Sequence, residues 1–209
     1  GDARLQPLAR LQSAALRRMG VDSAAQLAID AVFDAYNRAN PVNMLCVYTL
    51  LARLIRPDGQ ALAPDVVLWS APPSIERLPR MYEPAEMSPQ LRRTLEGLSS
   101  AEATGGVMGG ALAIPSLYRH LVPWPDYIGW IADGLRPYLE DRRMKQSVAA
   151  IRARMAREAE SLVVHVPPAL ALQAHPEAKI ALTRFSSLIP EMIVVGRLLK
   201  EALPESAAP

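Results

Sequence analysis

The chain has 209 residues, of which half are hydrophobic, 5% are aromatic and 21% are charged, and its formal net charge is +2. This length and apolar content suffice for a packed core, and the scarcity of aromatic residues favours helices over sheets. The mixed charges give no polyelectrolyte character, so nucleic acid is excluded as a partner. The 19 prolines predict many short helices with sharp ends.

Cys46 is the only cysteine, so the sequence has no disulfide framework, no CxxC pair and no thiolate metal cluster. The three histidines lack the spacing of a metal motif. No apolar run reaches the length of a membrane span, and arginines interrupt the apolar positions near the N-terminus, unlike a signal peptide. We therefore expect a cytoplasmic protein with no metal, no cofactor and no membrane partner.

The first quarter of the chain has apolar residues at helical spacing. This spacing predicts a helix over Leu5–Met19 that ends at Gly20. Ser23 followed by Gln26 is a capping-box pattern, which predicts a second helix over residues 24–38.

A proline is expected to end this second helix. Pro41 disfavours helical geometry at Asn40, so we expect Asn40 to be an N-cap and Pro41 to begin a third helix. That helix, Pro41–Arg56, is apolar on nearly all sides and is predicted to be deeply buried, with Cys46 an inert thiol in the core.

Residues 58–87 are rich in proline and predict an ordered crossover, within which Val66–Trp69 is either a strand-like piece or an apolar clip. Ser88 and Pro89 then predict a helix that continues to Leu98. The run TGGVMGG, residues 104–110, lacks the Lys-Ser/Thr of a phosphate loop and favours close helix packing instead.

Prolines also mark the predicted helices of the C-terminal half. We expect helices over residues 115–121, 126–136, 137–166, 169–173, 176–187 and 190–203, and a frayed tail over residues 204–209. The long helix over 137–166 carries a basic face, which is typical of a surface that faces solvent.

Two segments share one layout: a helix, a break, a proline and a second apolar helix. The matched residues, at one constant offset, are Phe33, Tyr36, Pro41, Met44 and Leu45 with Leu182, Phe185, Pro190, Ile193 and Val194. This predicts an all-α, single-domain fold of two pseudo-symmetric repeats packed face to face. The first repeat (1–57) is incomplete, and the crossover (58–87) joins it to the second (88–203).

The first repeat contains no counterpart of Ala111–Arg136. Either an N-terminal segment is missing, or the chain is a naturally shortened version of such a protein.

The segment Gly20–Leu51 resembles the middle of the group I 2-haloacid dehalogenases, which act on both D and L substrates. The shared features are Tyr36-Asn37, Asn40-Pro41 and, after the proline-rich crossing, Trp124-Pro125. The resemblance covers most of the chain and implies an all-helical fold of two repeats with the active site between them. It also implies direct hydrolysis, in which an aspartate activates the water that displaces the halide and an asparagine helps to hold that water.

Carried over residue by residue, the resemblance places the family's asparagine on Asn40 and its aspartate on Leu117, next to a retained Ser116. It places a pocket tyrosine on Phe185. No Asp or Glu occurs between Glu102 and Asp126, so no small shift of the alignment restores the base. His120 lies one helical turn after Leu117 and is the candidate replacement base.

Each of these residues also has a structural explanation. Asn40 can act solely as an N-cap, and His120, beside Arg119, can be a surface or interface residue. The backbone N–H groups of Ser116, Leu117 and Tyr118, in the first turn of a helix, are candidates for binding a carboxylate.

Two functions are therefore open. The first is a dehalogenase-like protein that is inactive in that reaction because Leu117 replaces the aspartate. The alternative is a non-catalytic module for binding a small carboxylic acid or for dimerisation. In both cases we expect a homodimer.

Overall fold

The computed structural model describes residues 5–55, 78–98, 114–166 and 176–204, and all regular structure within these ranges is helical. The α-helices are α1 (Ser13–Arg18), α2 (Ser23–Ile55), α3 (Pro89–Glu96), α4 (Ser116–Arg119), α5 (Pro125–Leu139), α6 (Arg142–Leu162) and α7 (Pro176–Ala202), with 3-10 turns η1 (Pro84–Glu86) and η2 (Val163–His165). The expected all-α class is confirmed. The predictions for residues 58–77, including 66–69, and for 104–110, 169–173 and 205–209 lie outside the described residues.

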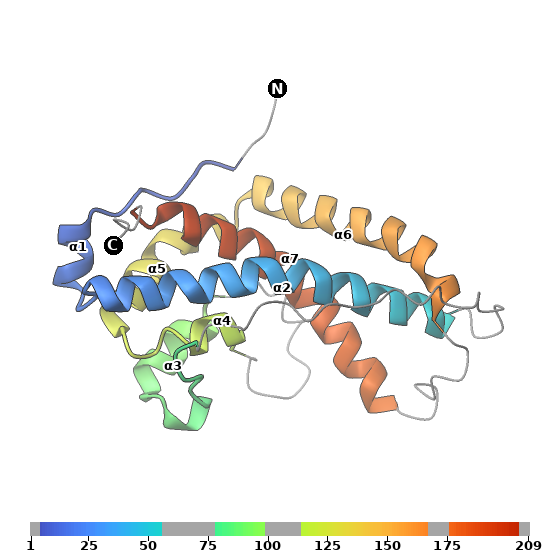
Figure 1. Ribbon diagram of the computed structural model, residues 1–209, viewed down its shortest axis with the longest axis horizontal. Coiled ribbons are helices and arrows are strands. Elements are labelled where there is room, and N and C mark those ends of the chain that lie inside the picture. The colour runs from blue at the N-terminus through green and yellow to red at the C-terminus, as the bar shows by residue number, and fades with distance from the viewer. Residues whose placement is uncertain (1–4, 56–77, 99–113, 167–175, 205–209) are drawn as a thin grey trace.

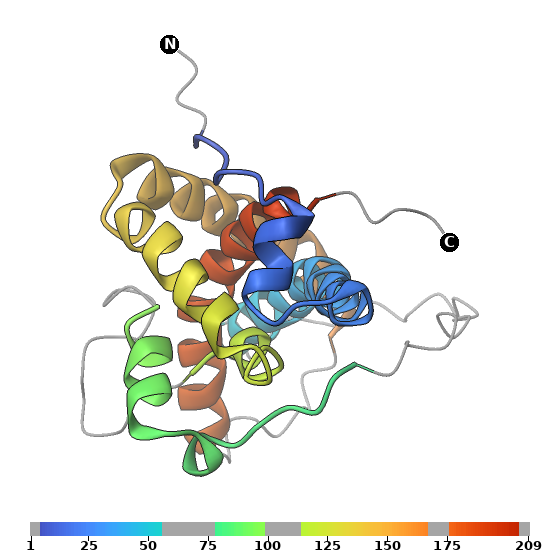
Figure 2. The same cartoon turned by 90° about the vertical axis from the view of Figure 1, so that its left-hand side faces the viewer.

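Helix α2 follows the long axis of the molecule, with α6 on one side of it and α3 and α4 on the other (Figures 1 and 2). Helix α7 runs antiparallel to α2, since the Nζ of Lys200 lies 2.7 Å from Asp30 Oδ1 and Gln26 Nε2 donates to the Pro204 carbonyl at 3.1 Å. The largest fully buried side chains come from α1 to α5 and from the turns that follow α3 and α4: Leu16, Ile29, Phe33, Met44, Leu95, Leu98, Leu117, Tyr118, Leu121, Tyr127, Ile128 and Ile131. No helix in the described ranges is both long enough and apolar enough to cross a membrane.

The predicted helix over Leu5–Met19 is wrong in its first half, because only α1 is helical. The preceding residues lie against α5 and α7, where the Leu11 N–H donates to the Ala202 carbonyl at 2.8 Å. This non-helical path buries both Leu8 and Leu11 in the core. Gly20 does end the helix as expected: its φ is +75°, a conformation that favours glycine.

The expected break in the second helix is also wrong, because α2 continues through Pro41 as one helix of 33 residues. Asn40 is therefore buried inside a helix and is not an N-cap. Apolar residues are buried on both sides of the proline, at Phe33 and Met44, so tertiary packing outweighs the local cost of the missing N–H. The cap at the start of α2 is Asp22, whose Oδ1 accepts from the Ala25 N–H at 2.8 Å, and not Ser23.

The second half of α2 is less buried than expected. Met44 and Val47 are buried, but Val42 is 60% exposed. Cys46 is also exposed, so it is not a core thiol.

Prolines lie inside two further helices. Pro137 is within α5, and Pro190 is within α7, so the helices predicted over 176–187 and 190–203 form one element. Figure 1 shows that α7 bends about midway along its length, as expected where a proline interrupts the hydrogen-bond ladder. By contrast, Ser88, Pro89 and Pro125 begin helices as predicted, with Ser88 Oγ accepting from Leu91 N–H at 3.2 Å.

The matched positions of the proposed repeat differ in their surroundings. Phe33 is fully buried, whereas its counterpart Leu182 is only half-buried, and Phe185, the counterpart of Tyr36, is 42% exposed. Helices α2 and α7 share an internal proline and pack against each other. The pseudo-twofold relation itself stays a prediction.

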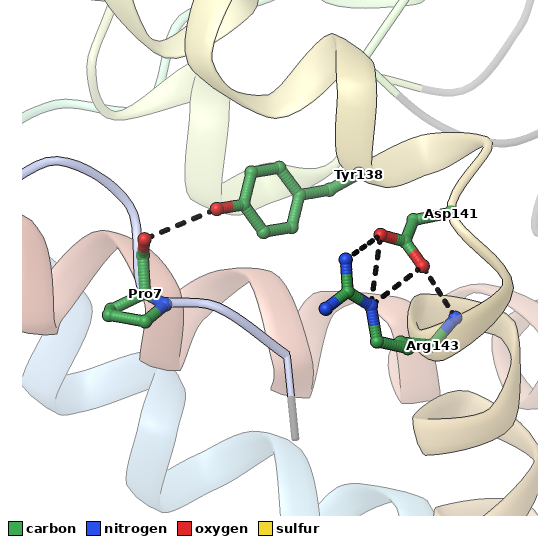
Figure 3. A network of polar contacts seen from close by, with 4 residues as sticks. All are labelled: Pro7, Tyr138, Asp141 and Arg143. Carbon is green, nitrogen blue, oxygen red and sulfur yellow. Dashed lines mark hydrogen bonds and ion pairs between the residues drawn. The ribbon is translucent and has the colours of Figure 1, made fainter. Parts of the chain in front are cut away.

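Helix α6 begins at a charged cap next to the N-terminal segment (Figure 3). Asp141 Oδ1 accepts from the Arg143 backbone N–H at 2.6 Å, and Arg143 Nη2 donates to Asp141 Oδ2 at 3.0 Å. Nearby, the Tyr138 hydroxyl donates to the Pro7 carbonyl at 3.2 Å and ties the N-terminal segment to α5. The side chain and backbone of Arg143 both lower the pKa of Asp141.

We expect Asp141→Asn to lower the free energy of unfolding at neutral pH. The depressed pKa means that the ionised carboxylate stabilises the folded state above its unfolded pKa of about 3.9, and that this contribution is lost as the pH falls through the lower, folded-state value. Chemical denaturation between pH 3 and 7 tests this, with Asp133→Asn, at an exposed pair 3.8 Å apart, as the control. A difference between wild type and Asp141→Asn that does not change with pH would contradict the assignment.

Candidate functional site

Helix α4 meets α2 and α7 at Gly196. Asn37 Nδ2 donates to the Gly196 carbonyl at 3.2 Å. A Cβ on residue 196 would lie 2.6 Å from Asn37 Oδ1 and 3.6 Å from Leu117 Cδ1. An alanine at position 196 would therefore require the hydrogen-bonded Asn37 side chain to move, and Leu117, only 1% exposed, packs beside the same position.

Polar side chains gather beside this contact, and we call Tyr36, Ser116, Arg119 and His120 the α4 polar cluster. The rings of Tyr36 and His120 meet edge to face, with centroids 5.8 Å apart. Burial raises the pKa of Tyr36, while a hydrogen bond with the Ser116 side chain and the charge of Arg119 act in the opposite direction. The cluster thus places two hydroxyls, an imidazole and a guanidinium within one region.

His120 is buried, at 9% exposure, and is not the surface residue considered from the sequence. Its Nδ1 lies 2.6 Å from the Pro79 carbonyl oxygen. Because a carbonyl oxygen only accepts, this contact assigns a proton to Nδ1. In the neutral ring, Nε2 is then left with a lone pair, which is the form that a general base requires.

The Arg119 side chain contacts the same segment of the chain as His120 does, residues 79–83. Its Nε donates to the Tyr82 carbonyl at 2.7 Å, and its Nη2 forms an ion pair with Glu83 Oε1 at 2.5 Å. This ion pair between Arg119 Nη2 and Glu83 does not have the geometry of a hydrogen bond. The Arg119 side chain is only 15% exposed, so most of it is shielded from solvent by the protein.

A buried carboxylate that the sequence interpretation missed lies on α7. Glu191 is 3% exposed, and its charge adds to burial in raising the pKa of Tyr118. The Tyr118 hydroxyl donates to the Leu98 carbonyl at 3.4 Å. Glu191 is the only charged residue in the apolar run Leu188–Val195, and a lone charge in such a run is the signal that points to it.

Most of the predicted site residues lie on α4, at its C-cap or on α2. Ser116, Leu117 and His120 lie on or just after α4, and Asn40 lies on α2 one helical turn after Tyr36.

Two predicted positions do not fit. The Tyr118 N–H already donates to the Pro115 carbonyl at 3.0 Å, so it is not available to a carboxylate. Phe185 is 42% exposed and precedes Gly196 by eleven residues, or about 16 Å along a helix. It therefore does not line the same region.

Within the described residues, no three His, Cys, Asp or Glu side chains are placed to hold a metal ion. Comparison with models of known protein families gives no match, and the curated proteins compared with the chain show no significant similarity.

We expect Gly196→Ala to destabilise the protein by about 1–3 kcal/mol, because its Cβ would collide with Asn37 Oδ1 at 2.6 Å. In an Asn37→Ala background the same substitution should cost little, since the colliding atoms are gone. Gly134→Ala, whose Cβ would meet Leu8 Cδ2 at 3.5 Å, is the matched control and should be neutral or stabilising. Chemical denaturation gives the free energy of unfolding of all four variants. Additive changes in this free energy for the substitutions at positions 37 and 196 would refute the contact.

Proposed function

We propose that the chain is a 2-haloacid dehalogenase-like protein that binds a small carboxylic acid at the α4 polar cluster and does not carry out the family's direct hydrolysis. The observation that carries this proposal is the environment of Leu117. The resemblance assigns the water-activating aspartate to this position, but the side chain is apolar, 1% exposed and packed against the α2–α7 contact. A hydrophobe cannot take a proton from water, which is a poor nucleophile near neutral pH.

The choice of a carboxylic acid follows from the donors of the cluster. The guanidinium of Arg119 and the Nδ1–H of the adjacent His120 point to the same segment of chain, where both meet oxygen atoms. A guanidinium pairs well with a carboxylate because its planar donors match the two oxygens. The hydroxyls of Ser116 and Tyr36 supply further polar groups next to these donors.

The test measures halide release and acid binding on the same preparation. We expect no halide release from D- or L-2-chloropropionate, and a saturable change in the NMR signals of the His120 ring on adding sodium propionate. Sodium chloride at equal ionic strength is the control for a general salt effect. The His120→Gln and Arg119→Gln variants should lose the binding.

A second experiment tests whether the site lacks only a general base for hydrolysis. Halide release by Leu117→Asp, and not by Leu117→Asn, would support an otherwise intact site. Because position 117 is buried, both variants are expected to be destabilised, and circular dichroism must show that they fold.

Halide release by the wild type would contradict the proposal. Turnover that survives both Asn40→Ala and His120→Ala would also overturn the location of the site. Turnover that is lost in Glu191→Gln would instead identify the buried α7 carboxylate as the base.

Dimerisation is the second candidate function, and exposed apolar side chains on α7 favour it. Ile180 is 53% exposed and Phe185 is 42% exposed, both in the N-terminal half of the helix. Exposed apolar surface of this kind is typical of interaction sites.

The exposed thiol of Cys46 accords with a reducing, cytoplasmic location.

We expect the wild type to sediment as a homodimer, and the double variant Ile180→Gln, Phe185→Gln to sediment as a monomer at the same concentration. Analytical ultracentrifugation measures this. The double variant Leu27→Gln, Val42→Gln, at two exposed positions on α2, is the control and should remain dimeric. A monomeric wild type would exclude this function.

A further inference from the structure

Arg119, the last residue of α4, and His120, its C-cap, hold the segment Leu78–Glu83, which we call the strap. The His120 Nδ1 contacts the Pro79 carbonyl, the Arg119 Nε donates to the Tyr82 carbonyl, and Arg119 Nη2 pairs with Glu83. In return, the Tyr82 N–H donates to the Arg119 carbonyl at 3.2 Å. These contacts join parts of the chain that are about forty residues apart in sequence.

The strap supplies only oxygen atoms to the donors of the α4 polar cluster. Two of these oxygens are backbone carbonyls, and the third belongs to the carboxylate of Glu83. A small carboxylic acid would present the same kind of oxygen to the same nitrogens. The strap therefore occupies the donors in the way that a bound ligand would.

No residue of the strap is fully buried, although Arg80 pairs with Glu86 and the Glu83 side chain caps η1. The middle residues of the strap, Arg80 and Met81, are exposed, and the Glu83 side chain is 64% exposed. Leu78 and Tyr82 are only partly buried where they pack against the core. Segments with few buried contacts open at low free energy, without unfolding of the whole domain.

We infer that the strap is an autoinhibitory element, in which Glu83 and two carbonyls compete with a carboxylate ligand for Arg119 and His120. This inference rests on the proposed binding of a small carboxylic acid. Ligand binding displaces the Glu83 carboxylate from the guanidinium and releases the Tyr82 backbone from α4. Arg119 and His120 then bind the ligand in place of the strap.

The experiment compares the wild-type chain with Glu83→Gln, which removes the competing charge but keeps a side chain of similar size. Glu96→Gln is the control, because it removes the same charge from a pair with Arg92 on α3, away from the strap. Propionate affinity is measured from the His120 ring signals at constant ionic strength. Hydrogen exchange of the Tyr82 amide, whose N–H donates to Arg119, reports release of the strap.

We expect Glu83→Gln to bind propionate about two- to fivefold more tightly than wild type, as the loss of a partly exposed ion pair implies. Its Tyr82 amide should exchange faster without ligand, and propionate should accelerate that exchange in the wild type. Glu96→Gln should match the wild type in both measurements.

Two outcomes would overturn the inference, and they can be told apart. If propionate binds with equal affinity to all three proteins and leaves Tyr82 exchange unchanged, the strap does not compete, although the acid-binding site stands. If no protein binds propionate, the proposed function itself fails.

Discussion

The antiparallel contact between α2 and α7 is the constraint on which the rest of the structure depends. The Asn37 side chain donates to the Gly196 carbonyl, and Lys200 lies between Asp30 and Asp34 one turn further along α7. Burial lowers the pKa of Lys200, but the hydrogen bonds with Asp30 and Asp34 and the charges of these carboxylates together outweigh it, so the pKa is raised. A glycine backbone, an amide and an ionic triad thus fix the register of the two longest helices.

Helix α4 is too short to be stable by itself, and its position follows from that register. Leu117 fills the space beside Gly196, and this anchors the turn that carries Ser116, Arg119 and His120. The buried face of α4 is therefore committed to packing, while its polar residues face Tyr36 on α2 and the strap. This division is compatible with the proposed binding of a small acid, and it places a buried hydrophobe, Leu117, where the proposed resemblance would put a carboxylate.

The helical class and several helix starts could be predicted from sequence because they depend on local chemistry. Ser88 and Pro89 cap and begin α3, and Gly20 ends α1. Pro41 and Pro190 misled the prediction, because their local cost is outweighed by apolar residues buried on both sides. Glu83 and the strap could not be found either: their contacts with Arg119 and His120 join residues far apart in sequence, and nothing in the local pattern marks them.

The contact between Tyr82 and Arg119 also closes a loop, since the two residues are 37 positions apart. The entropy lost on closing a flexible loop grows only with the logarithm of its length, so doubling that length costs about 0.6 kcal/mol. Closing this loop also fixes the two ends of the segment that carries α3, whose Leu95 and its neighbour Leu98 are buried in the core. The entropy cost of the closure is therefore offset in part by apolar burial within the loop itself.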